Sequence, residues 1–394
     1  MAFNTTFKIL CFASMLISTI KPNYGDQIFD VTEYGAIADG TTDNSAAFLN
    51  AWNAACKIGG SATFLIPRGA FFLGPVSFRG PCTGNQSPRV EIRGTVSAPE
   101  DLRRIRAVGW IEFRSLVGLV VGGGGILDGK GAESWDTCHF CRNRPITLRL
   151  IKLRHSRVEN LTLLNSKGFH MAIHLSNYTD VSHLKILAPG SSPNTDGCHV
   201  SGSTFVNITN ILVGTGDDCI SIGAGSSNIS ISGVYCSPGH GISIGSLGKY
   251  PKEKDVVGVR VRNCTISRAL NGVRIKTWAG SRPSAAKDIV FEDIIMKNVS
   301  HPIVIDQEYC PSHGCADKPS LVQISDVLFK NIQGTTTKLQ GAIFFCSKRV
   351  PCKNVRLENI SLDYIRDGIR SGAASLCSNM LDTVFGDMKT NPCQ

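Results

Sequence analysis

Two adjacent carboxylates, Asp217 and Asp218, stand in the stretch TGDDCISIG, directly before residues that alternate between apolar and small. Repulsion between neighbouring carboxylates raises the pKa of at least one of them, which costs folding free energy unless the perturbed acid is used. Paired aspartates also occur in ordinary turns. The stretch therefore has two interpretations, a plain turn or a pair of acids that performs proton transfer.

The spacing of other polar residues favours proton transfer. Asp196 in SPNTDG lies as many residues before Asp218 as His240 in PGHG lies after it. If these segments are equivalent parts of successive repeats, both carboxylates and the histidine lie at one edge, with Asp217 beside them. Such a cluster suits an inverting glycosidase, in which a protonated acid donates to the leaving oxygen while an ionised partner activates water.

Two cations follow in NGVRIKTW. Arg274 and Lys276 are two residues apart, so in a strand both side chains lie on one face. Arginine suits a bidentate contact with a carboxylate, and lysine suits a point-charge contact. Taken alone the two could be a solvated strand face, but beside the acids they predict a site for an acidic sugar.

Short strand-like units recur from about residue 150 onward. The inward apolar residues of one series recur at variable intervals. The shortest of these intervals equals the one between Asp196 and Asp218, and the others are longer. Fixed strands with insertions confined to loops are typical of a parallel β-helix, whereas a propeller needs four strands per repeat and a leucine-rich repeat needs a leucine frame. The predicted inward positions are Ile173, Cys198, Ile220, Ile242, Val273, Ile303 and Ile343.

This pattern predicts an all-β fold whose successive rungs lie about 4.8 Å apart, so that equivalent positions stack into columns. Residues 26–394 are expected to form one β-helical catalytic domain, because no boundary interrupts the repeats. Residues 44–57, NSAAFLNAWNAACK, predict an amphipathic helix that covers the open end. Residues 1–25 join a basic start at Lys8 to an apolar run, which is typical of a secretory signal peptide.

The chain contains 15 cysteines, of which Cys11 lies in the predicted signal peptide, and the even number that remains suits an oxidising compartment. A zinc site at Cys138 and Cys141 is disfavoured, because no second ligand pair stands at zinc-ribbon spacing. Close spacing predicts local disulfides for Cys310 with Cys315, Cys346 with Cys352, and Cys377 with Cys393. Sequons for N-glycosylation stand at Asn85, Asn160, Asn177, Asn207, Asn228, Asn263, Asn298 and Asn359.

The formal net charge of +10 fits a polyanionic partner, with simple solubility as the alternative explanation. Secretion argues against nucleic acid as that partner. No run of about 18 apolar residues follows the N-terminal segment, which argues against a membrane span. An extracellular acidic polymer is the partner that we expect.

The motifs SPNTDG, GDD, GHG and RIK, in this order, resemble the polygalacturonase family of glycoside hydrolases, family 28. The resemblance extends from FDVTEYGAIADG at residue 29 to the closing cysteine pair. It implies a right-handed parallel β-helix that needs no cofactor and no metal. It also implies that Asp217 is the general acid, that Asp196 and Asp218 activate water, and that His240 supports the protonation state of the acid.

The same resemblance implies that Arg274 and Lys276 bind the substrate carboxylate and that Asn194 shapes the site. It further implies a disulfide between Cys219 and Cys236.

The sequence departs from the family pattern at Cys198, where an aliphatic residue is usual, and at Ser237, where glycine is common. Neither departure replaces a catalytic group. A buried free thiol at Cys198 would force a second unpaired cysteine, for which Cys264 is the candidate.

Within the family, GHGISIGSLGKYPKEKDV and the segment from HPIVIDQEYC to HGC most resemble pollen exopolygalacturonases of plants. This implies hydrolysis of α-1,4-galacturonosyl linkages in pectin from chain ends, by a secreted, monomeric protein of the cell wall. An endo-acting polygalacturonase is the first alternative. A second alternative is a pectate lyase, which would need calcium and an arginine base. A family member that acts on rhamnogalacturonan is disfavoured by the RIK cations. A catalytically silent pectin-binding protein is also disfavoured, because it would not need the acids.

Overall fold

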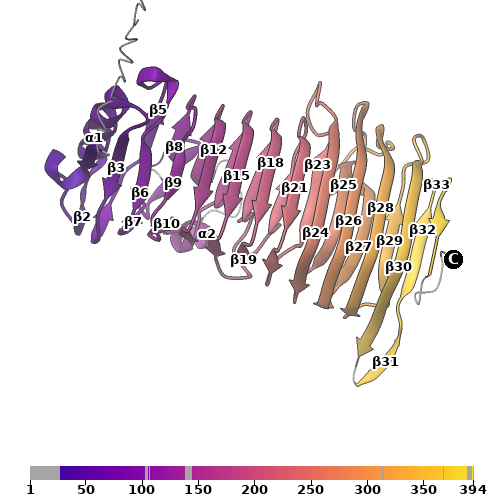
Figure 1. Cartoon of the computed structure of the whole chain (residues 1–394). Coiled ribbons are helices and arrows are strands. Elements are labelled where there is room, and N and C mark those ends of the chain that lie inside the picture. The colour runs from indigo at the N-terminus through magenta and orange to yellow at the C-terminus, as the bar shows by residue number, and fades with distance from the viewer. Residues whose placement is uncertain are drawn as a thin grey trace, which may run out of the picture.

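The strands coil into an elongated stack of rungs (Figure 1). Equivalent strands of successive rungs pair in parallel and form columns that run the length of the molecule. This confirms the predicted parallel β-helix. The computed structural model describes residues 27–102, 105, 107–137, 144–311, 315–366, 368–387 and 393. The predicted signal peptide, residues 1–25, and the pair Cys138 and Cys141 lie outside these residues.

One column is a sheet of parallel strands that carries the acidic motifs at its edge. Its strands are β5 (Val76–Arg79), β8 (Gly109–Arg114), β11 (Ile146–Ile151), β14 (Met171–His174), β17 (Cys198–Ser201), β20 (Ile220–Ile222), β23 (Ile242–Leu247), β25 (Asn271–Trp278), β27 (His301–Tyr309), β29 (Gln340–Phe345) and β32 (Ala374–Ser378).

Two further columns close the coil, and four long strands belong to both of them. The first contains β1 (Gln27–Asp30), β3 (Ala62–Ile66), β6 (Arg89–Ile92), β9 (Val120–Gly122), β12 (Arg154–Glu159), β15 (Asn177–Ser182), β18 (Thr204–Thr209) and β21 (Ser227–Ser232). The second contains β2 (Asp39–Asp43), β4 (Ala70–Phe72), β7 (Thr95–Ser97), β10 (Ile126–Asp128), β13 (Thr162–Leu164), β16 (Lys185–Leu187), β19 (Leu212–Gly214) and β22 (Tyr235–Cys236). The long strands are β24 (Val256–Ser267), β26 (Ser284–Val299), β28 (Val322–Thr336) and β30 (Cys352–Arg366).

The C-terminal end is formed by shorter strands that pair with β30. β31 (Ile369–Gly372) pairs with it in antiparallel fashion, and β33 (Met380–Leu381) and β34 (Val384–Phe385) pair with it in parallel. The helical segments are η1 (Val31–Tyr34), α1 (Ser45–Ile58), η2 (Thr83–Asn85) and α2 (Ala132–Thr137). No helix among the described residues is long and apolar enough to cross a membrane.

Alternate side chains of each strand fill the interior. Ile220, Ile222, Ile242 and Ile244 are fully buried, and they stack because the strands that carry them pair in register. β-branched side chains pack well on a pleated surface, and each fully buried isoleucine contributes about 1.5–3 kcal/mol of burial free energy. The stacked aliphatic core therefore holds successive rungs at a fixed register, which also fixes the loops at the strand ends.

The predicted inward column is right from Cys198 to Ile303 and wrong at its two ends. Met171, not Ile173, pairs with Cys198. A shift of two residues leaves the inward face unchanged, so apolar alternation could not detect it. At the other end Ala342, not Ile343, is the fully buried partner, because the apolar run around it offers no alternation to read.

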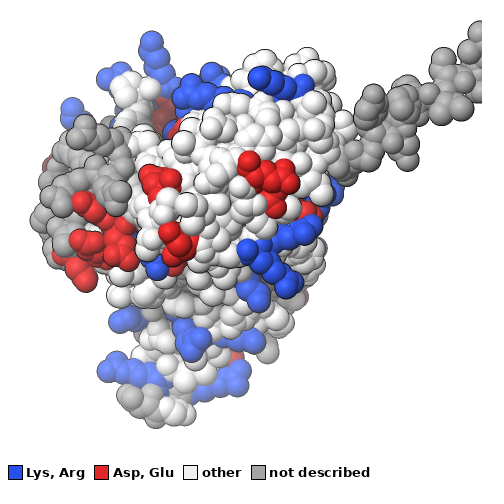
Figure 2. Space-filling model, turned by 90° about the vertical axis from the view of Figure 1, so that its left-hand side faces the viewer, with Lys and Arg blue, Asp and Glu red and all other residues white. Residues whose placement is uncertain are grey.

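Helix α1 covers the N-terminal end of the stack, which confirms the predicted cap (Figure 1). Its buried face packs Trp52 against the rings of Phe64, Phe78 and Phe113 at centroid distances of 5.9, 5.2 and 5.8 Å. Seen from this end, acidic and basic side chains are scattered in several small groups over a largely uncharged surface (Figure 2). The net positive charge is therefore not gathered into one patch on the cap.

We expect Trp52→Ala to lower the free energy of unfolding by about 3–5 kcal/mol, because it empties the centre of this aromatic cluster. Trp52 is 1% exposed. Calorimetric melting should show the loss. Leu49→Ala, on the partly buried face of the same helix, is the matched control and should cost clearly less. Equal losses in both variants would contradict the packing role of the cluster.

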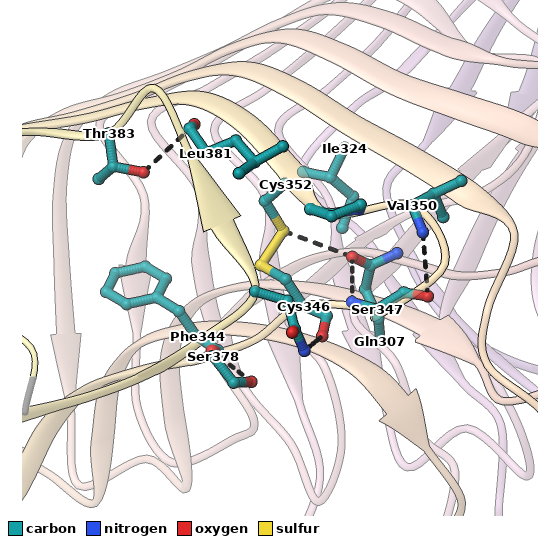
Figure 3. Close-up of a disulfide and its surroundings, with 12 residues drawn as sticks. Gln307, Ile324, Phe344, Cys346, Ser347, Val350, Cys352, Ser378, Leu381 and Thr383 are labelled. Carbon is teal, nitrogen blue, oxygen red and sulfur yellow. Dashed lines mark hydrogen bonds between the residues drawn. A yellow bond between two sulfur atoms is a disulfide. The ribbon is translucent and has the colours of Figure 1, made fainter.

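The predicted local disulfides are confirmed, and so are the free, buried thiols of Cys198 and Cys264. Near the C-terminal end, the Cys346–Cys352 disulfide lies against Gln307, whose Oε1 accepts a hydrogen bond from the Ser347 N–H at 3.0 Å (Figure 3). Gln307 Nε2 donates to the Val322 carbonyl at 2.7 Å. This buried amide ties the disulfide loop to strands β27 and β28. A further disulfide joins Cys56 at the end of α1 to Cys82.

Candidate active site

Three loops that precede successive strands of one sheet carry the acidic and histidine motifs. Register between the strands places Cys198 beside Ile220 and Ile220 beside Ile242, so the residues before them also lie on successive rungs. The Gly197 N–H donates to the Asp218 carbonyl at 2.9 Å, and the His240 N–H donates to the Asp217 carbonyl at 2.8 Å. Backbone hydrogen bonds thus hold the three loops directly against one another.

Close approach of two of these loops requires glycine at position 216. A Cβ atom there would lie 2.0 Å from the Ser192 carbonyl oxygen. The motif GDD therefore needs its glycine so that the Asp217 and Asp218 loop can lie against the loop that carries Asn194 and Asp196. Asn194 itself has a φ of 56°, a left-handed conformation that asparagine tolerates better than most residues.

Asp218 lies at the centre of a buried charge cluster. Its carboxylate accepts hydrogen bonds from Arg274 at 2.8 Å, from Lys276 Nζ at 2.6 Å and from Ser243 Oγ at 2.8 Å. The side chains of Arg274 and Lys276 are 11% and 7% exposed, and that of Asp218 is 2% exposed. The two cations that the motif RIK predicts as substrate ligands are therefore held by a protein carboxylate in this structure.

The two cations differ in their access to solvent-filled space. Lys276 lines the cavity described below, and an ammonium group has two further donors beyond the one given to Asp218. Arg274 donates to Asp218 and, through Nε at 3.1 Å, to Ser243, so its guanidinium faces the protein. Lys276 is accordingly the cation best placed to contact a ligand, while Arg274 holds the cluster together.

Asp217 lies beside this cluster and is more exposed, at 23% of its side chain. Its Oδ1 accepts from His240 Nδ1 at 3.1 Å and from the Asp218 N–H at 2.8 Å. Burial tends to raise the pKa of Asp217, but the hydrogen bond and charge of His240 and the charge of Lys276 outweigh it and lower the pKa. Without a ligand, Asp217 therefore favours its ionised form.

Asp196 has the opposite tendency. It is 5% exposed, and its Oδ2 accepts a hydrogen bond from Ser221 Oγ at 2.6 Å. Burial, followed by the charges of Asp217 and Asp218, raises the pKa of Asp196 well above its usual value. Of the two acids, Asp196 therefore holds a proton more readily when the site contains no ligand.

A disulfide between Cys219 and Cys236 braces the site from the interior. It connects the residue after the acid pair to the last residue of β22, shortly before His240. The buried bridge lies against Gly239, where an added Cβ would meet Cys219 Sγ at 2.8 Å. The bridge thus limits relative movement of the Asp217 and His240 loops.

A cavity of about 520 Å³ opens over these residues. Its lining includes Asn194, Asp196, Asp217, Asp218 and Lys276. Other lining residues were not identified as site residues from the sequence. These include Phe169, His174, His199, Lys249, Tyr250, Glu253 and Tyr309.

Two kinds of position account for several of the residues that sequence reasoning missed. His199 and Ser221 occupy strand positions next to recognised motifs, where the alternation that marks outward-facing residues could have identified them. Lys249, Tyr250 and Glu253 lie in the loop after β23, whose path no periodic pattern specifies.

A metal ion is a poor fit for the acidic cluster. Ligand atoms of Asp217, Asp218 and His240 lie within 4.8 Å of one another, which is close enough to share an ion. However, Asp218 is already paired with Arg274 and Lys276, whose positive charges would repel a cation at the same oxygens. The arrangement favours proton transfer and binding of an anion over binding of a metal.

Comparisons with known proteins agree with this geometry. Residues 56–384 match the model of glycosyl hydrolases family 28. The chain is 44% identical over 365 residues to an exopolygalacturonase of Platanus acerifolia, covering 91% of this chain and 96% of the relative. It is 42% identical over 369 residues to a polygalacturonase of Nicotiana tabacum, covering 93% of this chain and 91% of the relative.

Solved structures share the fold. An exopolygalacturonase from Thermotoga maritima superposes with a TM-score of 0.72 at 19% identity, covering 92% of each chain. An endo-xylogalacturonan hydrolase from Aspergillus tubingensis superposes with a TM-score of 0.76 at 21% identity, covering 90% of this chain and 96% of that one.

Proposed function

Because this chain belongs to glycosyl hydrolases family 28 and is therefore a glycosidase, we propose that it cleaves α-1,4-galacturonosyl linkages of polygalacturonate with inversion, releasing galacturonic acid from chain ends. The observation that carries this proposal is a single cavity in which two acids with opposed pKa shifts lie beside the buried ammonium of Lys276. Polygalacturonate supplies both a carboxylate for the ammonium and a glycosidic oxygen for an acid.

We assign the general acid to Asp217, because its side chain is the more exposed and lines the cavity. Asp196 and Asp218 activate the attacking water from the neighbouring positions. Asp196 and Asp217 come from successive rungs, about 4.8 Å apart at the backbone. With side-chain splay, this spacing is compatible with the roughly 6.5–9.5 Å between carboxyls that leaves room for a water in inverting enzymes.

Substrate binding has to move the shared proton from Asp196 to Asp217. Without ligand, the charge of Lys276 contributes to the low pKa of Asp217. A galacturonate carboxylate beside Lys276 offsets this charge and displaces water, and both effects favour the protonated form of Asp217. A proton on Asp217 removes one of the charges that raise the pKa of Asp196, so Asp196 can ionise and act on water.

This coupling predicts two different pH profiles. Activity is lost as pH rises through the pKa of the general acid. The pH profile of kcat/KM reports this pKa in the free enzyme, and the profile of kcat reports it in the complex with substrate. The alkaline limb of kcat/KM should therefore lie at lower pH than the alkaline limb of kcat. In His240→Asn, which removes the main interactions that lower the pKa of Asp217, the alkaline limb of kcat/KM should move to higher pH. Reducing-end assays across pH would measure both; coincident limbs in the unmodified protein would contradict the proton shift.

Exo action is supported by a braced loop at one side of the cavity. Glu253 accepts hydrogen bonds from the N–H groups of Gly248 at 2.7 Å and Tyr250 at 2.8 Å. Lys249 Nζ lies 5.0 Å from the centroid of the Trp278 ring. We infer that this loop, whose residues line the cavity, closes part of the groove, as an enzyme that accepts only chain ends requires. The name of the Platanus relative supports the same interpretation.

The test of the proposed function is a time course on demethylated polygalacturonate, following product length, reducing ends and viscosity together. Monomer from the first time points with slow loss of viscosity is the expected result. Mixed oligomers with rapid loss of viscosity would keep hydrolysis and overturn exo action. An absence of new reducing ends would overturn the proposed function.

The disulfides support secretion into an oxidising compartment, where we place this protein as a glycosylated, monomeric enzyme of the cell wall, of the kind found in pollen. The sequon residues Asn207 and Asn228 are exposed and can accept glycans.

A further inference from the structure

A stack of three aromatic side chains lies on the outer surface of the column that contains β12, β15, β18 and β21 (Figure 1). The rings of His155 and Tyr178 have an interplanar angle of 7°, those of Tyr178 and Phe205 an angle of 6°, and the centroids of each pair are 4.7 Å apart. Tyr178 is 49% exposed and Phe205 is 44% exposed. The acids belong to a different column, so the stack lies outside the catalytic cavity.

The three residues share a backbone conformation that is unusual for large side chains. The φ angles of His155, Tyr178 and Phe205 are 51°, 55° and 54°, in the left-handed region. Glycine, asparagine and aspartate tolerate this region, whereas a bulky residue there is strained. The next two rungs carry Asn228 and Gly258 at the equivalent position. The rings therefore occupy strained positions, a feature that is concentrated at binding sites.

The stack ends at Phe205, because the next rung supplies no ring. One face of Phe205 is covered by Tyr178, and the other face is turned toward the rung of Asn228. Asn228 begins the sequon Asn-Ile-Ser that ends at Ser230, and both residues are exposed. The acceptor of a glycan thus stands one rung from an open aromatic face.

The surroundings of Asn228 leave room for a saccharide. Within the described part of the chain, its amide nitrogen donates no hydrogen bond. The following rung has Gly258, where an added Cβ would lie only 3.4 Å from Asn228 Oδ1, so any larger side chain would extend over the asparagine. A hollow of about 520 Å³ on this face includes Tyr178, Phe205 and Asn228 in its lining.

Other exposed sequon asparagines have polar neighbours instead. Asn207 Nδ2 donates to Asp180 Oδ1 at 2.9 Å, and Asn359 Nδ2 donates to Asn331 Oδ1 at 2.9 Å. Neither nitrogen is free in the way that the Asn228 nitrogen is. The setting of Asn228 next to a ring is therefore not a general feature of the sequons.

We propose that Asn228 carries an N-linked glycan whose first N-acetylglucosamine packs on the open face of Phe205 and extends the stack by one ring. The proposal rests on the secretion proposed above, because such glycans are added on that route. In the transfer, Asn228 Nδ2 loses a proton and bonds to the anomeric carbon of the sugar. The bond from that carbon to the diphosphate of a lipid-linked donor breaks, and the diphosphate keeps the electron pair and takes up the proton.

Strand spacing and surface chemistry both fit this occupant. Equivalent positions on neighbouring rungs are about 4.8 Å apart, which is a distance at which flat rings pack. The C–H face of the sugar can cover the apolar face of Phe205 while its hydroxyl groups stay in water. The glycan would thus remove exposed aromatic surface from water without entering the catalytic cavity.

The test separates occupancy of Asn228 from its contact with Phe205. The full-length chain is secreted from a eukaryotic host, and its glycopeptides are mapped by mass spectrometry, where we expect Asn228 to be glycosylated. Ser230→Ala removes the sequon and keeps Asn228, whereas Ser230→Thr keeps the sequon. We expect the Ser230→Ala protein to melt about 1–3 °C below the Ser230→Thr protein, the size of one aromatic contact in a chain of this length.

Phe205→Ala should cancel this difference, because no ring remains for the sugar to cover. Phe205→Leu keeps the apolar bulk without the flat face and serves if Phe205→Ala fails to fold. His155→Ala is the matched control. It alters the far end of the stack, three rungs or about 14 Å from Asn228, so it should leave the difference between the Ser230 variants intact.

Three results would overturn the proposal. The first is an Asn228 without glycan on a protein whose other sequons are occupied, and the second is a glycan at Asn228 that stabilises the Phe205→Ala protein equally. The third is retention of the Ser230→Ala protein on cellulose or xylan that Phe205→Ala abolishes, which would assign the ring to a wall polysaccharide.

Failure of the premises is distinguishable from these results. A protein without glycan at any sequon would reject the proposed glycoprotein and this inference together. Reducing-end release from polygalacturonate is measured on the same samples. Its absence would reject the proposed hydrolysis and leave the glycan contact unaffected.

Discussion

Asp217→Asn is expected to lower kcat on polygalacturonate by about 10²- to 10⁴-fold, the usual contribution of a positioned acid. An amide cannot protonate the leaving oxygen, yet it has nearly the shape of the carboxyl group. The hydrogen bond from the Asp218 N–H can be kept by the amide oxygen. We therefore expect KM and the melting temperature to change little, and initial rates of reducing-end release would measure the effect.

The matched control for this variant is Asp180→Asn. Asp180 is exposed on β15, where it accepts a hydrogen bond from Asn207 at 2.9 Å, outside the cavity of the acids. This variant should retain full activity. If Asp217→Asn also retained it, the assignment of the general acid would be wrong, although the fold and the family would be unaffected.

Lys276→Met should damage both stability and activity. The methionine stem fills the same space, but Asp218 loses the donor at 2.6 Å and keeps only Arg274 as a charged partner. Removing one partner of a buried ion pair costs about 3–5 kcal/mol, and we expect the lower end because Arg274 remains. Loss of the ammonium that faces the cavity should also raise KM for polygalacturonate. We expect a rise of at least about tenfold, which corresponds to the free energy of one charge-assisted hydrogen bond.

Denaturant or thermal unfolding would measure the first effect and initial rates the second. Lys330→Met is the control, because Lys330 forms a partly exposed ion pair at 3.3 Å with Glu292, which also pairs with Arg262, and surface pairs contribute about 0–1 kcal/mol. Equal destabilisation in the two variants would show that the buried cluster is no more important than a surface pair. A normal KM in Lys276→Met would mean that another cation binds the substrate carboxylate.

Asp217 and Asp196 illustrate why roles cannot be assigned from residue type alone. Both are aspartates in loops before strands of one sheet, yet the pKa of one is lowered and that of the other is raised. The difference arises from His240 beside Asp217 and from the deeper burial of Asp196. A site with two such acids can hold one proton in two places, and we expect the ligand to decide between them.

The repeating fold, the cap and the stacking of the acidic loops could all be predicted from the order of residues along the chain. The interval that separates Asp196 from Asp218, and Asp218 from His240, is the length of one rung, and parallel strands of fixed length must bring residues at that interval together. The helix over residues 44–57 was likewise evident, because amphipathic periodicity depends only on local order along the chain.

The contacts of each side chain in those loops became known only from the folded molecule. The motif RIK predicts two ligands for a substrate, but folding directs both cations to Asp218. Lys249 and Glu253 line the cavity from the loop after β23, whose hydrogen bonds no repeat encodes. The physical reason is that backbone hydrogen bonding repeats with the rung and leaves its period in the sequence, whereas side-chain direction, burial and loop path depend on neighbours many residues away.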